Sequence, residues 1–279
     1  MWIWSEESTF PKLKICSYIQ GMTNTSPLRY PGGKTRAIKI LTEILEKNFP
    51  ERTKLLSPFL GGGSLELHLC GKGLEVIAND LFIPLYTFWS VVKSNPNELA
   101  EKVKKEVPVS KERFHLLREE IQKTKDPMEM ASMYYIINRC SFSGSTFCGG
   151  FSKQSAEGRM TDTIIENITK ADLSNLTMTN LDCREFLEKH PESENTVVYA
   201  DPPYYITNYI YGRDGDLHES FDHKAFAEVI KKRKDYIISY NDCEYIRNLY
   251  EGCRIEEVSW SYGMNKNKKS SEIIIMPSI

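Results

Sequence analysis

Short apolar runs rich in β-branched residues recur along the chain, as in the buried strands of a parallel sheet. Between them, apolar residues return at the spacing of helices that bury one face, as from Ile38 to Leu45 and from Phe226 to Ile230. This alternation predicts an open α/β sheet. The predicted strands are the run that begins at Leu55, Leu74–Asp80, Leu176–Asn180, Val197–Ala200, Tyr236–Tyr240, Arg254–Trp260 and Glu272–Met276. The last two alternate in polarity and predict an antiparallel hairpin.

A different pattern fills the middle of the chain. From Leu81 to about Arg139 the spacing is helical, and basic residues alternate with acidic ones, which is typical of a solvated helix face. Residues 138–159 then combine glycines, hydroxyls and phenylalanines with basic side chains. Basic groups suit phosphates and polar side chains suit base edges. An ordinary glycine-rich hairpin or lid is nevertheless the commoner structure with this composition.

Length and composition restrict the class of protein. The 279 residues suffice for one domain with an inserted subdomain, and the net charge of −2 does not by itself indicate a nucleic-acid partner. Seven scattered cysteines without a Cys-X-X-Cys pair argue against a disulfide framework or a zinc site and fit a reducing, cytoplasmic location. No apolar run approaches the length of a membrane span. Residues 1–22 lack the apolar core of a signal peptide and predict a loosely ordered extension.

The stretch Val197–Tyr204 carries the clearest chemistry. Two prolines end its apolar run, which places Asp201 at the carboxyl end of a buried strand, where open α/β sheets bind ligands. Asp201 and the carbonyl of Pro202 could each accept a hydrogen bond from the exocyclic amine of a nucleobase. The Tyr204 ring could stack on a base that has left the helix. The alternative is a Pro-Pro turn in which the aspartate is only a turn residue.

Three further features suit a cofactor that contains a nucleoside. The glycine turn Gly61–Gly63 lies between a strand and a helix, and Asp80 ends the next strand about twenty residues later, where an acid accepts ribose hydroxyls. Gly-Gly-Lys-Thr at 32–35 lacks the first glycine of a P-loop, but Lys34 at a helix start could hold a carboxylate or be a solvated surface residue. Asp182 follows a third strand, where it could contact an adenine amine or only cap the next helix.

These residues together resemble the Dam-type, alpha-class DNA adenine-N6 methyltransferases. The resemblance rests on four blocks in order, which are Leu28–Lys34, Pro58–Ser64, Asp201–Tyr204 and Ser239–Asp242, and it extends from about Pro27 to the C-terminus. It implies a Rossmann-like sheet of seven strands, closed by a reversed hairpin, that binds S-adenosyl-L-methionine. Transfer would be direct and in line, with no metal and no covalent enzyme intermediate. Leu60 and Pro31 depart from the commonest form of these blocks.

The same resemblance implies the roles of individual residues. Asp201, Pro202 and Tyr204 would be catalytic. The cofactor would contact Tyr30, Lys34, Phe59, Leu60, Gly61, Gly63, Asp80, Asp182 and Asp201, with Lys34 near the methionine carboxylate. DNA would contact Asn138, Arg139, Ser143, Lys153 and Arg159, together with Asn208 and Arg213 from the polar loop after the active strand. Residues 23–92 and 161–279 would form the catalytic domain, and residues 93–160 an inserted, mainly helical target-recognition domain.

Other activities stay open at the level of sequence. The same fold methylates cytosine N4 or adenine in RNA, and an inactive relative could be a DNA-binding module. Aspartate, rather than serine or threonine, before the two prolines favours adenine. The expected partner is double-stranded DNA, recognised at a short sequence in which the adenine is flipped out. A monomer or weak dimer would suffice, and a restriction endonuclease is a candidate functional partner.

Overall fold

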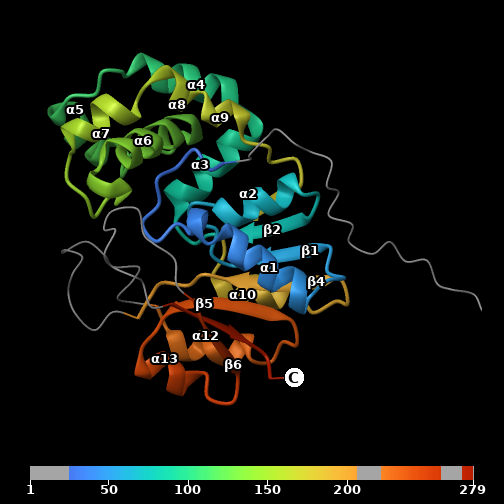
Figure 1. Ribbon diagram of the computed structural model, residues 1–279. Helices are drawn as coiled ribbons and strands as arrows, with labels where there is room; N and C mark the ends of the chain where they lie inside the picture. Colours follow the sequence, from blue (N-terminus) through green and yellow to red (C-terminus); the bar gives the residue numbers. More distant parts are fainter. Residues whose placement is uncertain (1–24, 206–220, 259–271, 279) are drawn as a thin grey trace, which may run out of the picture.

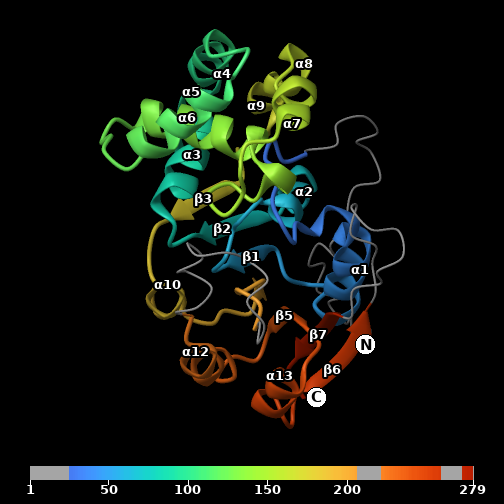
Figure 2. The same ribbon diagram turned by 90° about the vertical axis from the view of Figure 1, so that its left-hand side faces the viewer.

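The structure is a computed structural model that describes residues 25–205, 221–258 and 272–278. Seven strands form one sheet in the order β3-β2-β1-β4-β5-β7-β6 (Figures 1 and 2). All neighbours from β3 to β5 pair in parallel, whereas β7 runs antiparallel to both β5 and β6. The strands are β1 Lys54–Ser57, β2 Glu75–Asn79, β3 Leu176–Thr179, β4 Thr196–Ala200, β5 Tyr236–Asn241, β6 Arg254–Val258 and β7 Glu272–Met276. The predicted α/β sheet and its terminal hairpin are confirmed.

Helices cover both faces of the sheet, so the central strands are mostly apolar on both faces rather than alternating between apolar and polar residues. On one face, Leu55 and Val197 join a core with α1 (Ile38–Asn48), α2 (Ser64–Gly71) and α3 (Ile83–Ser94). On the other face, Leu56 and Val198 pack with α10 (Cys183–Lys189), α12 (His223–Ile230) and α13 (Glu244–Leu249). Adjacent strand residues therefore serve opposite faces, and this alternation decides which side chains can meet.

A set of helices from the middle of the chain lies at the end of the molecule opposite β6 and α13 (Figures 1 and 2). It consists of α4 (Pro96–Lys105), α5 (Lys111–Glu120), α6 (Pro127–Cys140), α7 (Lys153–Arg159), α8 (Asp162–Ile165) and α9 (Asn167–Lys170). Ser110 and Asp126 begin α5 and α6 as N-caps, each accepting a backbone N–H three residues later. The helices share one continuous hydrophobic core with α3 and the sheet, through Leu99 and Tyr135.

Candidate active site

Asp201 directly follows β4 at the point where the strand order changes direction. The strands from β1 to β3 lie on one side of this point and those from β4 to β6 on the other. Ligands of open α/β sheets bind in the crevice at the carboxyl ends of such strands. The predicted position of Asp201 at a central strand end is therefore confirmed, and its side chain is 24% exposed.

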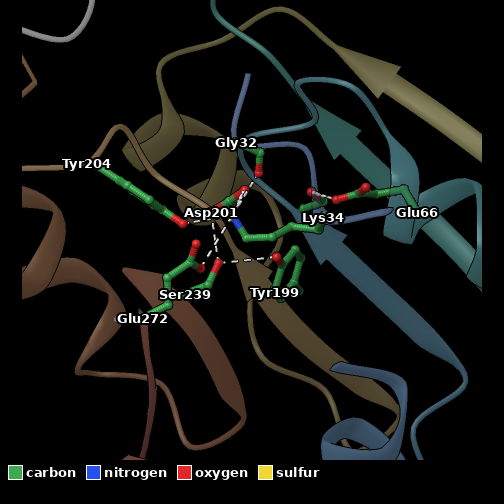
Figure 3. A network of polar contacts seen from close by, with 9 residues as sticks. Gly32, Lys34, Glu66, Tyr199, Asp201, Tyr204, Ser239 and Glu272 are labelled. Carbon is green, nitrogen blue, oxygen red and sulfur yellow. Dashed lines mark hydrogen bonds and ion pairs between the residues drawn. The ribbon is translucent and has the colours of Figure 1, made fainter. Parts of the chain in front are cut away.

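Polar side chains from four strands gather on one face of the sheet beside Asp201 (Figure 3). Two-residue alternation places Tyr199 and Asp201 on the face covered by α1 and α2, and the strand register places Ser239 of β5 there as well. Ser57 ends β1 on this face, and Glu272 begins β7. The cover comes from Lys34, in the short helix η1 (Lys34–Arg36), and from Glu66 of α2. The result is a polar cluster between the sheet and its helices.

Lys34 is the cation of this cluster and is almost completely buried. Its ammonium donates to both carboxylate oxygens of Asp201, at 2.7 and 2.8 Å, and to the Tyr204 hydroxyl at 2.9 Å. It also donates to the Gly32 carbonyl at 3.2 Å and lies 3.9 Å from Oε2 of Glu272. The reading of Lys34 as a solvated surface residue is wrong. Its ammonium group instead forms an ion pair with the Asp201 carboxylate.

The loop before Lys34 explains how the lysine reaches the site. Gly33 N–H donates to the Tyr30 carbonyl at 2.9 Å, which closes a β-turn with Pro31 and Gly32 in its middle positions. Pro31 suits the first of these positions, and Gly32, at φ +72°, suits the second. Pro31, a departure from the commonest form of its block, therefore has a direct structural role.

Two buried carboxyl groups of the cluster were not recognised in the sequence. Glu66 is 3% exposed and accepts from Ser57 Oγ at 2.7 Å. Burial raises the pKa of Glu66 to about 7, and the negative charge of Asp201 acts in the same direction. Glu272 is 1% exposed and faces Lys34. An acidic residue within an otherwise apolar helix or strand was the available signal in both cases.

Tyr204 and Tyr199 keep their protons in this environment. Burial, followed by the negative charge of Asp201, raises the pKa of both phenols above the ordinary value. Tyr204 is half-buried, and its hydroxyl accepts from Lys34, so its orientation is coupled to the ion pair. The structure thus brings the predicted catalytic residues together at the end of β4.

The glycine turn and Asp80 form a second group, at the ends of β1 and β2. Asp80 accepts from Gly61 N–H at 2.9 Å and from Phe82 N–H at 3.0 Å, so it supports the turn that it was predicted to accompany. Gly61 and Gly63 have φ values of +51° and +64°. The indole of Trp89 donates to the Gly61 carbonyl at 3.1 Å. The turn is held from both sides in a conformation that favours glycine.

The aromatic ring of Tyr30 lies over this turn. A Cβ atom at Gly62 would lie 2.7 Å from Cβ of Tyr30, and one at Gly61 would lie 3.1 Å from the Tyr30 ring. Only glycine permits this approach at both positions. Phe59 stacks edge-on against Phe226, and Leu60 is buried, so neither presents a free apolar side chain at the surface.

Asp182 is the N-cap of α10, the helix that follows β3, in agreement with one of the two interpretations that the sequence allowed. It accepts from Arg184 N–H at 2.9 Å and from the Arg184 guanidinium at 2.8 Å. These bonds lower the pKa of the Asp182 carboxyl, with the side-chain bond from Arg184 as the largest cause. The carboxyl remains 40% exposed.

The segment 138–159 proves to be a tight loop followed by α7, and two of its predicted DNA contacts lie in the interior. Asn138 is completely buried and holds the Arg29 backbone, accepting from its N–H at 2.9 Å and donating to its carbonyl at 2.6 Å. Arg139 is 8% exposed and donates to the carbonyls of Arg159 and Pro27. In contrast with the sequence prediction, both support the loop before Lys34 from inside.

Other predicted DNA residues do reach the surface. Lys153 and Arg159 are exposed on α7, although Lys153 lies 3.7 Å from Glu157, and Ser143 is partly exposed at φ +57°. Next to Ser143, the Phe142 ring is 64% exposed, an apolar surface group that the sequence pattern did not indicate. Asn208 and Arg213 lie outside the described residues.

The fold and the site together define the class of protein, which is a Rossmann-like methyltransferase. They combine this strand order, an antiparallel β7 and an Asp-Pro-Pro-Tyr segment at the switch point. A family model described as D12 class N6 adenine-specific DNA methyltransferase matches residues 30–264. The chain therefore belongs to this family, whose members methylate adenine N6 in DNA. Membership of an adenine-specific family favours adenine, rather than cytosine, as the base that accepts the methyl group.

The chain is also similar, along most of its length, to curated proteins that are named DNA adenine methylase. A DNA adenine methylase from Vibrio cholerae is 22% identical over 262 residues, covering 86% of this chain and 90% of the relative. Relatives with the same name come from Haemophilus influenzae, 23% identical with 94% of this chain and 92% of the relative covered, and from Escherichia coli K12, 24% identical with 91% and 95% covered. Within the part of the chain that the structure describes, no helix combines the length and apolarity needed to cross a membrane.

Proposed function

We propose that this chain transfers a methyl group from S-adenosyl-L-methionine to N6 of an adenine that is flipped out of a short sequence in double-stranded DNA. The observation that carries the proposal is the Asp201 carboxyl group at the switch point between β1 and β4, with Pro202 and Tyr204 directly after it. An amine that enters the crevice would meet the Asp201 carboxylate, a hydrogen-bond acceptor, at this position.

The second group of residues fits the methyl donor. A glycine turn in the left-handed region, the amino-terminal end of α2 and the Asp80 carboxyl at the end of β2 are suited to a nucleoside. Asp80 would hold the ribose, and Asp182, with its carboxyl 40% exposed, would hold the adenine ring. Phe59, Leu60 and Gly63 would line the same space. When bound, S-adenosyl-L-methionine supplies an electrophilic methyl group on a sulfonium.

Asp201 would act on the acceptor amine. Its carboxylate and the Pro202 carbonyl accept the two N–H bonds, which directs the nitrogen lone pair toward the methyl group. As the nitrogen–carbon bond forms and the carbon–sulfur bond breaks, positive charge develops on nitrogen, and the carboxylate stabilises it. Asp201 would also take the proton that the methylated nitrogen releases. Tyr204 would stack on the flipped base, a contact of about 1–3 kcal/mol.

Lys34 would exchange partners during this reaction. Its ammonium now binds both oxygens of Asp201, and the amine needs one of them. A positive charge at this position also opposes charge development on the reacting nitrogen. We therefore assign Lys34 to the methionine carboxylate in the loaded enzyme, with Tyr30 beside it.

The set of helices would form most of the target-recognition domain, which the sequence predicts at residues 93–160. This domain would lie between the two parts of the catalytic domain, residues 23–92 and 161–279. Arg159, Lys153 and Ser143 would contact DNA from the loop and α7, and exposed Phe142 suits stacking against a base step. Asn138 and Arg139, being interior, are proposed to position the loop instead. A monomer can methylate both strands in separate visits, with or without a partner restriction endonuclease.

The test is methylation of DNA with labelled S-adenosyl-L-methionine, followed by nucleoside analysis and single-molecule sequencing of the product. N6-methyladenine within one short motif is the expected result. N4-methylcytosine would overturn the substrate. Absence of label in any DNA, despite cofactor binding in a calorimetric titration, would indicate an inactive relative, and label confined to RNA would change the acceptor.

A further inference from the structure

The fourth sequence block, Ser239–Asp242, has no role in the reaction described above. It begins at a serine in the interior of β5, and this serine lies directly beside Asp201. The parallel register pairs Tyr199 with Ile237 and Ala200 with Ile238, so the next pair along the two strands is Asp201 and Ser239. Ser239 is completely buried and Tyr199 is 2% exposed. The three side chains share one face of the sheet (Figure 3).

The hydrogen bonds among them have one consistent direction. Ser239 Oγ donates to Oδ1 of Asp201 at 2.8 Å, because a carboxylate paired with Lys34 can only accept. The serine proton is then used, so Ser239 Oγ accepts from the Tyr199 hydroxyl, 3.2 Å away. Tyr199 is a protonated phenol and has a proton to donate. These two hydrogen bonds form a chain that runs from Tyr199 through Ser239 to a single oxygen of Asp201.

We propose that Ser239, oriented by Tyr199, is a positioning residue that fixes the rotation of the Asp201 carboxylate and leaves Oδ2 for the acceptor amine. The inference rests on the role proposed for Asp201. Lys34 cannot provide the same selection, because its ammonium contacts both oxygens almost equally and its side chain is long and rotatable. Ser239 lies within a strand that is bonded on both sides, so its hydroxyl position is rigid.

The hydrogen-bond chain would also act on the electrostatics of Asp201. A hydrogen bond to the carboxylate stabilises its ionised form, which is the form that accepts from the amine. Among the described residues, the other charged or titratable groups around Asp201 are Tyr30, Lys34, Glu66, Tyr199, Tyr204, Tyr240 and Glu272. Glu66 titrates near neutrality, so it has to be separated from Asp201 in any pH experiment.

The experiment measures kcat against pH for Ser239→Ala, Ser239→Thr and Tyr199→Phe, at saturating DNA and S-adenosyl-L-methionine. Loss of one hydrogen bond to a charged group predicts a kcat about 10- to 100-fold lower in Ser239→Ala at neutral pH. The acidic limb of the profile should move to higher pH, and KM for DNA should change less than about 3-fold if no uniform binding is lost. Ser239→Thr, which keeps the hydroxyl, should restore both. Tyr199→Phe should give a smaller shift in the same direction.

Two comparisons make the result specific. If Tyr199 acts through Ser239, the double variant should match Ser239→Ala alone rather than add a second loss. The shift should also persist in a Glu66→Gln background. Ser132→Ala, at a buried serine of α6, and Tyr236→Phe, at a buried tyrosine at the start of β5, are the matched controls and should retain the wild-type profile.

The outcomes separate this inference from the proposed function. If wild type methylates adenine and Asp201→Ala does not, an unshifted acidic limb in both Ser239→Ala and Tyr199→Phe overturns the positioning role. Failure of Ser239→Thr to restore activity in a correctly folded protein also contradicts it. If Asp201→Ala retains full activity, the role proposed for Asp201 is wrong, whereas a wild-type protein that methylates no adenine would overturn the proposed function itself. Tyr199→Phe removes one atom, so it serves the test even if Ser239→Ala does not fold.

Discussion

The Lys34 ammonium lies 2.7 and 2.8 Å from the two carboxylate oxygens of Asp201, although 167 positions separate the residues in the chain. The pair links the loop before α1 to the end of β4 and so connects the proposed cofactor and acceptor regions. The contact is largely buried on the lysine side. A charge in such a place has to be matched by its partner, which makes each member sensitive to replacement of the other.

Replacement of Lys34 by methionine should lower turnover by about 100-fold or more and weaken cofactor binding. The variant removes the counter-charge of Asp201 and the proposed contact to the methionine carboxylate. Turnover and calorimetric titration with S-adenosyl-L-methionine measure the two effects separately. Lys39→Met, on the exposed face of α1, is the matched control, since Lys39 is 86% exposed. Wild-type cofactor affinity in Lys34→Met would restrict the lysine to Asp201.

The Asp201→Ala variant should lose methylation while it largely keeps cofactor binding. Removing an electrostatic group aimed at developing charge costs about 10²–10³ in kcat, and loss of the proposed proton acceptor adds to this. Rapid single-turnover assays with labelled cofactor measure the loss. Asp172→Asn, at an exposed turn before β3, should behave as wild type. Retained turnover in Asp201→Ala would move the reaction elsewhere.

Stability should depend on pH through Glu66. The pKa of the folded carboxyl group is about 7, above the ordinary value of 4.5, so the folded state holds a proton that the unfolded state has released between these values. The free energy of unfolding therefore falls as pH rises from about 4.5 to 7, by at most about 3 kcal/mol. Glu66→Gln should be progressively more stable than wild type over this range. Denaturant unfolding at pH 5, 6, 7 and 8 gives the difference, and a constant difference would refute the assignment.

The surface residues of α7 and the buried Arg139 should respond differently to substitution. Lys153→Ala and Arg159→Ala should each reduce the salt dependence of DNA binding by up to about one phosphate contact. Arg139→Ala should instead lower the melting temperature, because it leaves the carbonyls of Pro27 and Arg159 without their donor. Binding titrations at several salt concentrations, paired with thermal unfolding, distinguish the two classes. An unchanged salt slope in both α7 variants would place the phosphate contacts elsewhere.

The loop that precedes Lys34 should be sensitive to Gly144. Its φ is +74°, and an added Cβ would lie 2.6 Å from Cβ of Arg29. Gly144→Ala should therefore destabilise the protein by about 1–3 kcal/mol and displace the Arg29 segment that Asn138 holds. Gly150→Ala, at a glycine with open space around it, is the matched control. Equal stability of the two variants would show that the loop adapts without cost.

The sequence by itself determined the strands and the position of Asp201. Apolar runs, prolines and glycine turns act over a few residues, so the end of β4 at Asp201 and the turn at Gly61 could be predicted from local rules. The family resemblance followed from the order of four such blocks. The N-cap at Asp182, one of the two interpretations that its sequence position allowed, could be predicted for the same local reason.

Only the tertiary structure decided which of these residues meet. The strand order brings Ser239 of β5 and Glu272 of β7 to Asp201, and the turn at Gly32 directs Lys34 onto it. The tertiary structure also places Asn138 and Arg139 in the interior, although the composition of their segment had suggested a DNA-binding surface. A strand that is buried on both faces is apolar at nearly every position, so its pattern does not reveal which face a residue serves. That choice depends on pairing between strands that are distant in the chain.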